Sequence, residues 1–131
     1  MADNLAYVGA AIDQVVHDHG GQRAVVFAGF SQGVAMAFRA ASVFPDRVLG
    51  VVAVGGDVPP ELDRAALARV GHVLLMRGAR DPFYSVEMFR KDQQRLHDAA
   101  VHLTPVEFDG AHDWPGPVVD AAAGFLKARQ P

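Results

Sequence analysis

Apolar positions along the chain follow two alternating patterns. The first segment carries apolar side chains at helical spacing and ends at Gly20-Gly21; these side chains are Leu5, Val8, Ile12, Val15 and Val16. Three almost continuously apolar runs follow at residues 24–28, 48–54 and 73–76, and each stops at or just before a glycine. Residues 101–108 alternate between apolar and polar side chains. All four runs are typical of strands, and the continuous ones of strands buried on both faces of a sheet.

Helices are expected between these strands. The spacing predicts a helix over residues 32–42, ended by Phe44-Pro45, and a short helix over residues 63–69. A third helix is expected after Ser85, which would cap it. This helix carries Val86, Phe89, Leu96 and Ala100 at core spacing. Pro117 suits the first turn of a final helix, ahead of Val118, Val119, Ala122, Phe125 and Leu126. Parallel strands need such crossover connections. The pattern therefore predicts one α/β domain over residues 1–131, a parallel sheet of about four strands with helices on both faces.

Composition narrows the classes of function. Half of the 131 residues are apolar and 21% are charged, as in globular proteins. The net charge of −3, with no basic run, argues against a nucleic-acid partner. Because the chain has no cysteine, disulfides and thiolate chemistry are excluded. No apolar run approaches the roughly 20 residues of a membrane span, and the first residues lack the features of a secretory signal. We therefore expect a cytoplasmic protein with no membrane partner.

A motif of the form G-x-S-x-G, Gly29-Phe30-Ser31-Gln32-Gly33, ends the first predicted strand. Between a strand and a helix, this motif forms a sharp turn that exposes the serine hydroxyl above the edge of a sheet. Such a turn needs strained backbone angles at Ser31, and we expect Gly29 and Gly33 to relieve the crowding around it. The Gln32 N–H, at the start of a helix, would face developing negative charge. The alternative is that Ser31 only caps the helix.

A serine nucleophile requires a base and a carboxylate that orients the base, and in this context they follow in the order acid, then histidine. Asp81 suits the acid, since it follows a predicted strand and precedes Pro82. Asp57, which follows another predicted strand, is a rival. Asp81-Pro82 is alternatively no more than a turn, because Asp-Pro commonly opens turns.

Six histidines compete for the role of base, and only His112 lies in a loop beyond the last predicted strand. That loop reaches the edge of the sheet where Ser31 and Asp81 are expected. The other five fall in predicted helices or strands: His17, His19, His72, His97 and His102. An exposed loop histidine without function is the alternative for His112. No metal is expected, because the acidic and histidine residues show no metal-ligand spacing.

With these residues in place, the chain resembles the C-terminal part of an α/β-hydrolase, above all the phospholipase/carboxylesterase group that includes acyl-protein thioesterases and small bacterial esterases. The resemblance is carried by residues 29–33, 77–82 and 110–114. It implies that Ser31 is the nucleophile, Asp81 the acid and His112 the base. The chain departs from the group's pattern at Asp113, where the group has a glutamate, and at Val34, where it commonly has a glycine.

The resemblance also implies that part of the fold is missing. The family fold has about eight strands, with the serine turn after the fifth, and a loop after the third strand supplies a second oxyanion donor. We therefore expect either a fragment or truncated gene product, or a chain that associates with a second copy. Residues 25–27 would then form an unpaired sheet edge, and edges of this kind are templates for association. Only the last helix would cover one face of the sheet, leaving apolar surface open.

The leading hypothesis is a serine hydrolase that acts, without a cofactor, on small-molecule carboxylic esters or thioesters through an acyl-enzyme. Phe30, Phe83 and Trp114 would line the acyl pocket, although ordinary packing of large apolar side chains is an equal alternative. A second hypothesis is a catalytically weak remnant that serves as a binding or assembly module. A third is a peptidase, since nothing in the sequence separates amide from ester substrates.

Overall fold

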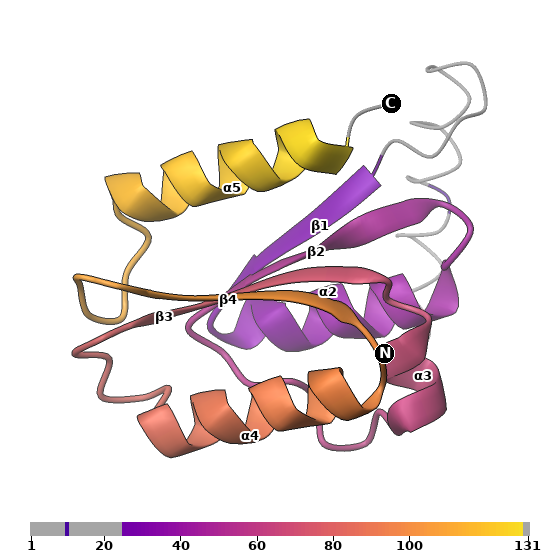
Figure 1. Cartoon of the computed structure of the whole chain (residues 1–131), viewed down its shortest axis with the longest axis horizontal. Helices are drawn as coiled ribbons and strands as arrows, with labels where there is room; N and C mark the ends of the chain where they lie inside the picture. The colour runs from indigo at the N-terminus through magenta and orange to yellow at the C-terminus, as the bar shows by residue number, and fades with distance from the viewer. Residues whose placement is uncertain (1–9, 11–24, 130–131) are drawn as a thin grey trace.

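The computed structural model of the chain describes residue 10 and residues 25–129. Four strands in this part form one parallel sheet in the order in which they occur along the chain (Figure 1). They are β1 (Val25–Phe30), β2 (Val48–Val54), β3 (His72–Gly78) and β4 (His102–Phe108). Except for residue 10, the helix predicted over residues 5–16 lies outside the described residues.

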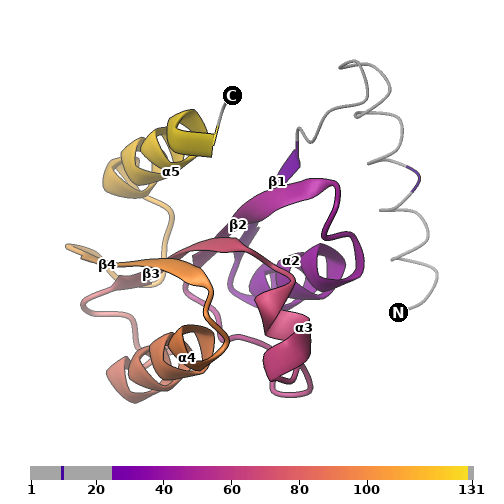
Figure 2. The ribbon, with the colours of Figure 1, turned by 45° about the vertical axis from the view of Figure 1, so that its right-hand side comes forward.

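Helices cover both faces of the sheet. The helix α5 (Gly116–Arg129) lies on one face, and α2 (Gln32–Val43), α3 (Arg64–Ala68) and α4 (Val86–Asp98) lie on the other (Figures 1 and 2). The sequence-based prediction of a parallel sheet with helices on both faces is therefore confirmed. None of the described helices has the length and apolar content that crossing a bilayer requires.

The two central strands explain the continuous apolar runs. In β2 and β3, alternate side chains enter two separate cores: Val51, Ala53, Val73 and Leu75 pack on the side of α2, α3 and α4, and Val52, Val54, Leu74 and Met76 on the side of α5. Successive side chains of a strand point to opposite faces of the sheet. Because both faces are covered, nearly every position of these strands must be apolar.

The cap of α4 is as the sequence predicts, but the helix ends earlier. The Ser85 hydroxyl accepts a hydrogen bond from the Met88 N–H, as an N-cap residue does. Ala100, expected at a core position of this helix, lies beyond its end, is exposed and has φ of +59°. The prediction for Ala100 is wrong because the chain reverses there in a left-handed turn before β4, which leaves Ala99 buried instead.

The strand β1 lies at one end of the strand order. Within the described part of the chain it pairs with β2 alone, and Val25, Val26 and Phe27 are half-buried. Association with a second copy through this edge stays a prediction. On α5, Val119 and Leu126 are exposed, whereas the sheet-facing Val118 and Phe125 are buried.

Candidate active site

The loops that follow the four strands meet at one edge of the sheet. Ser31 follows β1, Gly55 follows β2, Asp81 comes three residues after β3, and His112 lies in the loop after β4. Since all four strands are parallel, their carboxyl ends lie on the same side, where open α/β sheets bind their ligands. Ser31, Asp81 and His112, far apart in the sequence, are thereby brought together.

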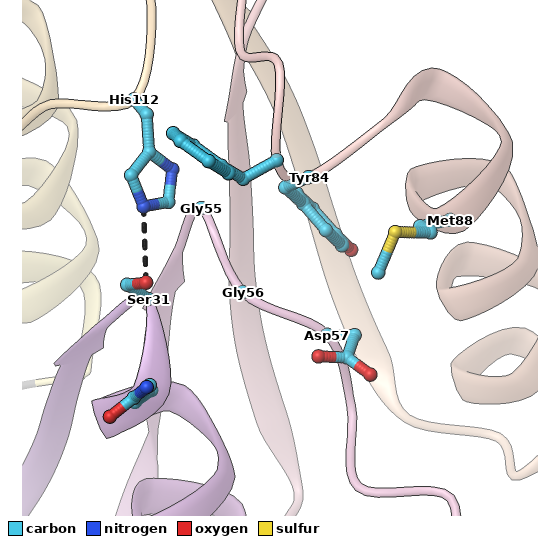
Figure 3. A pocket seen from close by; sticks show the side chains of 9 residues that line it. Ser31, Gly55, Gly56, Asp57, Tyr84, Met88 and His112 are labelled. Carbon is cyan, nitrogen blue, oxygen red and sulfur yellow. Dashed lines mark hydrogen bonds between the residues drawn. The ribbon is translucent and has the colours of Figure 1, made fainter.

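Ser31 has the strained backbone that the motif predicts. Its φ is +56° and its ψ −117°, and its side chain makes no capping hydrogen bond to α2. The Ser31 N–H donates to the Val54 carbonyl over 2.9 Å, which ties the turn to β2. The Ser31 hydroxyl lies 3.0 Å from Nε2 of His112 (Figure 3). The hydroxyl therefore faces an imidazole, and the alternative of a helix-capping serine is wrong.

The glycines around Ser31 differ from the expectation. A Cβ on Gly29 would lie 2.5 Å from the Gly33 carbonyl oxygen, so Gly29 is required. A Cβ on Gly33 would meet nothing within 4 Å in the described chain, and the expectation for Gly33 is wrong. The second crowded position is Gly56, where a Cβ would overlap the Ser31 carbonyl oxygen. At Gly56 the crowding arises where the loop after β2 approaches the Ser31 turn, and these two segments are neighbours in space and not in sequence.

Asp81 is a buried carboxylate with three hydrogen bonds. Its Oδ2 lies 2.8 Å from Nδ1 of His112, and its Oδ1 accepts from the N–H groups of Phe83 (2.8 Å) and Tyr84 (2.9 Å). Burial opposes the charge of Asp81 and is the largest single influence on it. The hydrogen bonds from His112 and from the two N–H groups together outweigh burial, so the pKa of Asp81 lies below its usual value. Asp81 is therefore ionised near neutral pH.

A buried arginine holds the loop that carries Asp81. Nε of Arg77 donates to the Tyr84 carbonyl (2.7 Å) and Nη2 donates to the Asp81 carbonyl (3.4 Å), while Nη1 pairs with Glu107 of β4 (2.8 Å). Sequence reasoning gave Arg77 no role, because an arginine at the end of an apolar run carries no signal of what it reaches. The fork of guanidinium donors fits the carbonyls of a tight loop.

The loop of His112 packs directly on the end of β3. A Cβ on Gly78 would lie 2.7 Å from the Gly110 carbonyl oxygen and would overlap that of Ala111. Two aromatic rings lie against the imidazole of His112, with centroids at 4.7 Å (Phe30) and 5.0 Å (Phe83). These contacts and the bond to Asp81 define the orientation of the ring.

A cavity of about 160 Å³ opens beside Ser31 and His112. It is lined by Ser31, Gln32, Gly55, Gly56, Asp57, Phe83, Tyr84, Met88 and His112 (Figure 3). Phe83 lines this cavity, whereas Phe30 and Trp114 do not. The ring of Phe30 lies against His112, and Trp114 lies farther along the loop and is 39% exposed.

The remaining candidates are separate from this hydrogen-bonded set. Asp57 is exposed at the cavity wall, but the carboxylate bonded to His112 is Asp81. The rings of His72 and His102 stack on each other, 4.7 Å apart, at the amino ends of β3 and β4, and His97 lies on α4 beside Asp98; His17 and His19 lie outside the described residues. Among the described residues, no group of three or more side chains is arranged to hold a metal ion.

Chemically, a hydroxyl, an imidazole and a carboxylate in this order can activate the hydroxyl as a nucleophile. The imidazole can accept the hydroxyl proton at Nε2 while its Nδ1–H stays hydrogen-bonded to the carboxylate of Asp81. The N–H of Gln32, at the start of α2, takes part in none of the turn and loop hydrogen bonds of the described chain. It can therefore donate to an oxyanion formed near Ser31.

Comparison with known proteins adds a family and a fold. A family model described as Phospholipase/Carboxylesterase matches residues 1–130. A Bacillus cereus carboxylesterase superposes with a TM-score of 0.74 at 18% identity, over 96% of this chain and 60% of that one. Arabidopsis thaliana SOBER1 gives 0.81 at 20% identity (98% and 63%), and Zea mays acyl-protein thioesterase 2 gives 0.72 at 16% (97% and 65%). The chain therefore spans less than two thirds of the length of these proteins, and no curated protein matches it.

Proposed function

Because the chain belongs to the phospholipase/carboxylesterase family, we propose that it is a serine hydrolase of carboxylic esters or thioesters. The observation that carries the proposal is the continuous series of hydrogen bonds from Asp81 through His112 to Ser31. Both bonds lie within hydrogen-bond reach, as transfer of the Ser31 proton to His112 and orientation of the ring by Asp81 require. The strained turn at Ser31 is further support, because strain of this kind persists where function requires it.

In the proposed reaction, Oγ of Ser31 attacks the acyl carbonyl carbon while Nε2 of His112 takes the hydroxyl proton. His112 then donates that proton to the oxygen or sulfur of the leaving group. The alcohol or thiol departs, and the acyl group remains bound to Ser31 as an ester. A water molecule then attacks this ester while Nε2 of His112 takes one of its protons. His112 passes this proton to Oγ of Ser31, which releases the carboxylic acid and restores the Ser31 hydroxyl. Asp81 holds the ring with Nδ1–H toward itself and stabilises the imidazolium that forms in both steps.

The site favours small acyl groups. A cavity of about 160 Å³ is below the roughly 300 Å³ at which pockets for drug-sized ligands begin. The N–H of Gln32 supplies one oxyanion donor, and the loss of a single donor in a related mechanism costs about 10²–10³ in turnover. We therefore propose a short-chain esterase whose turnover depends on whether a second donor is present.

Hydrolysis of p-nitrophenyl acetate and p-nitrophenyl octanoate tests the proposal, with p-nitroanilides to detect amide cleavage. We expect turnover of the acetate, none after Ser31→Ala, and unchanged turnover after Ser42→Ala, which removes a buried hydroxyl at the far end of α2. Covalent labelling of Ser31 by a fluorophosphonate without turnover favours the alternative of a catalytically weak remnant. If a folded sample shows neither labelling of Ser31 nor turnover, the proposal of a serine hydrolase is refuted.

A further inference from the structure

A second buried carboxylate lies close to the site and has no part in the mechanism above. Asp92, on α4, is 3% exposed. Its Oδ2 accepts two hydrogen bonds, from the hydroxyl of Tyr84 (2.7 Å) and from the backbone N–H of Val58 (3.1 Å). Burial raises the pKa of Asp92 above its usual value. A buried carboxylate is costly for a fold unless it is bonded, so its contacts are worth following.

The contacts of Tyr84 lead from Asp92 to the site. Tyr84 is 1% exposed, and its ring points from the His112 side of the cavity toward Asp57 and Met88 (Figure 3). Its N–H donates to Oδ1 of Asp81, and its hydroxyl donates to Asp92. Burial and the neighbouring negative charge of Asp92 raise the pKa of Tyr84, so the phenol keeps its proton and remains a donor. One residue therefore joins two buried carboxylates.

The other contact of Asp92 leads to the serine. The loop after β2 contains Gly55, Gly56 and Val58, and Asp92 holds this loop by the Val58 N–H. In the same loop, Gly56 packs so closely on the Ser31 carbonyl that a Cβ does not fit. Asp92 thus anchors both the loop that supports Asp81 and the loop that supports Ser31.

We propose that Tyr84 and Asp92 are positioning residues that hold the Asp81 carboxylate and the serine turn in reactive alignment. This inference rests on the proposed hydrolase function. Without the hydroxyl of Tyr84, its ring is held by packing alone, and the Tyr84 N–H, one of the two that donate to Oδ1 of Asp81, loses its support on the α4 side. Displacements of about 1 Å at a reacting group lower rates by about 10²-fold. A purely structural role would lower stability and leave the alignment of the site intact.

The test compares Tyr84→Phe, Asp92→Asn and Asp92→Ala with Ser42→Ala. The Ser42 variant is the matched control for Tyr84→Phe, because it also removes one buried hydroxyl, from a residue 5% exposed. Four quantities are measured: kcat and KM for p-nitrophenyl acetate, the rate of fluorophosphonate labelling of Ser31, and the downfield proton NMR signal of the His112 Nδ1–H. Thermal unfolding of each variant accompanies them.

We expect Tyr84→Phe to lower kcat and the labelling rate about 10-fold, within the range that sub-ångström displacements produce, with KM within twofold of the parent. The Nδ1–H signal should shift upfield or broaden. Asp92→Asn retains an acceptor oxygen and should recover part of what Asp92→Ala loses, whereas Ser42→Ala should lower the melting temperature alone. The inference is overturned if folded Tyr84→Phe, or Asp92→Ala, keeps the parent's labelling rate and Nδ1–H signal. If the parent neither labels nor turns over, the proposed function fails, and the NMR signal alone decides the positioning role.

Discussion

Gly56 offers a sharp test of how the serine turn is supported. The substitution Gly56→Ala adds one methyl group at a position that no recognised motif includes. A Cβ there would lie 2.9 Å from Cγ2 of Val34 and 3.0 Å from the carbonyl carbon of Ser31, and closer still to the Ser31 oxygen. Ordinary contact begins at 3.4 Å. Because the obstacle is backbone and not the end of a flexible side chain, the two loops must separate.

The size of the effect follows from that separation. The Ser31 carbonyl accepts from the Val34 N–H over 3.1 Å, so moving it disturbs the first turn of α2. A displacement on the order of 1 Å breaks the 3.0 Å contact between Ser31 and His112, and misplacement of this size costs about 10²-fold in rate. Overpacking of this kind also costs about 1–3 kcal/mol in the free energy of unfolding.

Gly33→Ala is the control, since a Cβ at Gly33 meets nothing within 4 Å in the described chain. Alanine in the first turn of α2 should preserve activity and raise stability by up to about 1 kcal/mol. The assay is kcat/KM for p-nitrophenyl acetate, with urea unfolding to confirm that each variant is folded. The reasoning is refuted if folded Gly56→Ala retains activity within threefold of the parent, or if Gly33→Ala loses as much activity as Gly56→Ala.

Two further predictions concern the carboxylates. Asp81→Asn should lower kcat for ester hydrolysis by about 10⁴-fold. The amide N–H₂ group facing Nδ1 of His112 favours the tautomer that cannot accept the Ser31 proton at Nε2. A decrease in kcat of less than about tenfold contradicts this prediction. The raised pKa of Asp92 means that the folded state binds this proton more tightly than the unfolded state. The stabilisation that this bound proton provides is therefore complete at a pH below the ordinary aspartate pKa, and it is lost as the pH rises through the raised pKa of Asp92. In urea unfolding at several pH values, the free energy of unfolding of Asp92→Asn should rise relative to that of the parent between acid and neutral pH. If the difference between the two free energies stays constant with pH, the reasoning is contradicted.

Much of the fold could be read from local pattern. The run at residues 48–54 coincides with β2 at both ends, because a strand covered on both faces has to be apolar throughout. Ser85 could be recognised as a cap because capping is a local interaction. The helical spacing extends α4 too far, to Ala100, because an apolar side chain satisfies the spacing whether or not the chain has already turned.

The three candidate site residues could also be predicted from sequence order. Each of Ser31, Asp81 and His112 follows a strand, and in a parallel sheet those positions share one edge. Residues that support them gave no such signal. Arg77, Tyr84 and Asp92 act through carbonyls, N–H groups and a hydroxyl of segments distant in sequence, and nothing in their spacing names those partners.

The amino-acid sequence by itself determined the alternation of strands and helices, the parallel sheet and the edge of it where the candidate site lies, because burial on one or two faces imposes its period on the residues. Only the tertiary structure decided which glycine is indispensable, which rings touch His112 and which buried carboxylate anchors the loops. Those contacts depend on strand register and loop path, which bring together atoms that no periodicity relates. The contrast between Gly33, inside the motif and uncrowded, and Gly56, outside it and pressed against Ser31, shows the difference at two single positions.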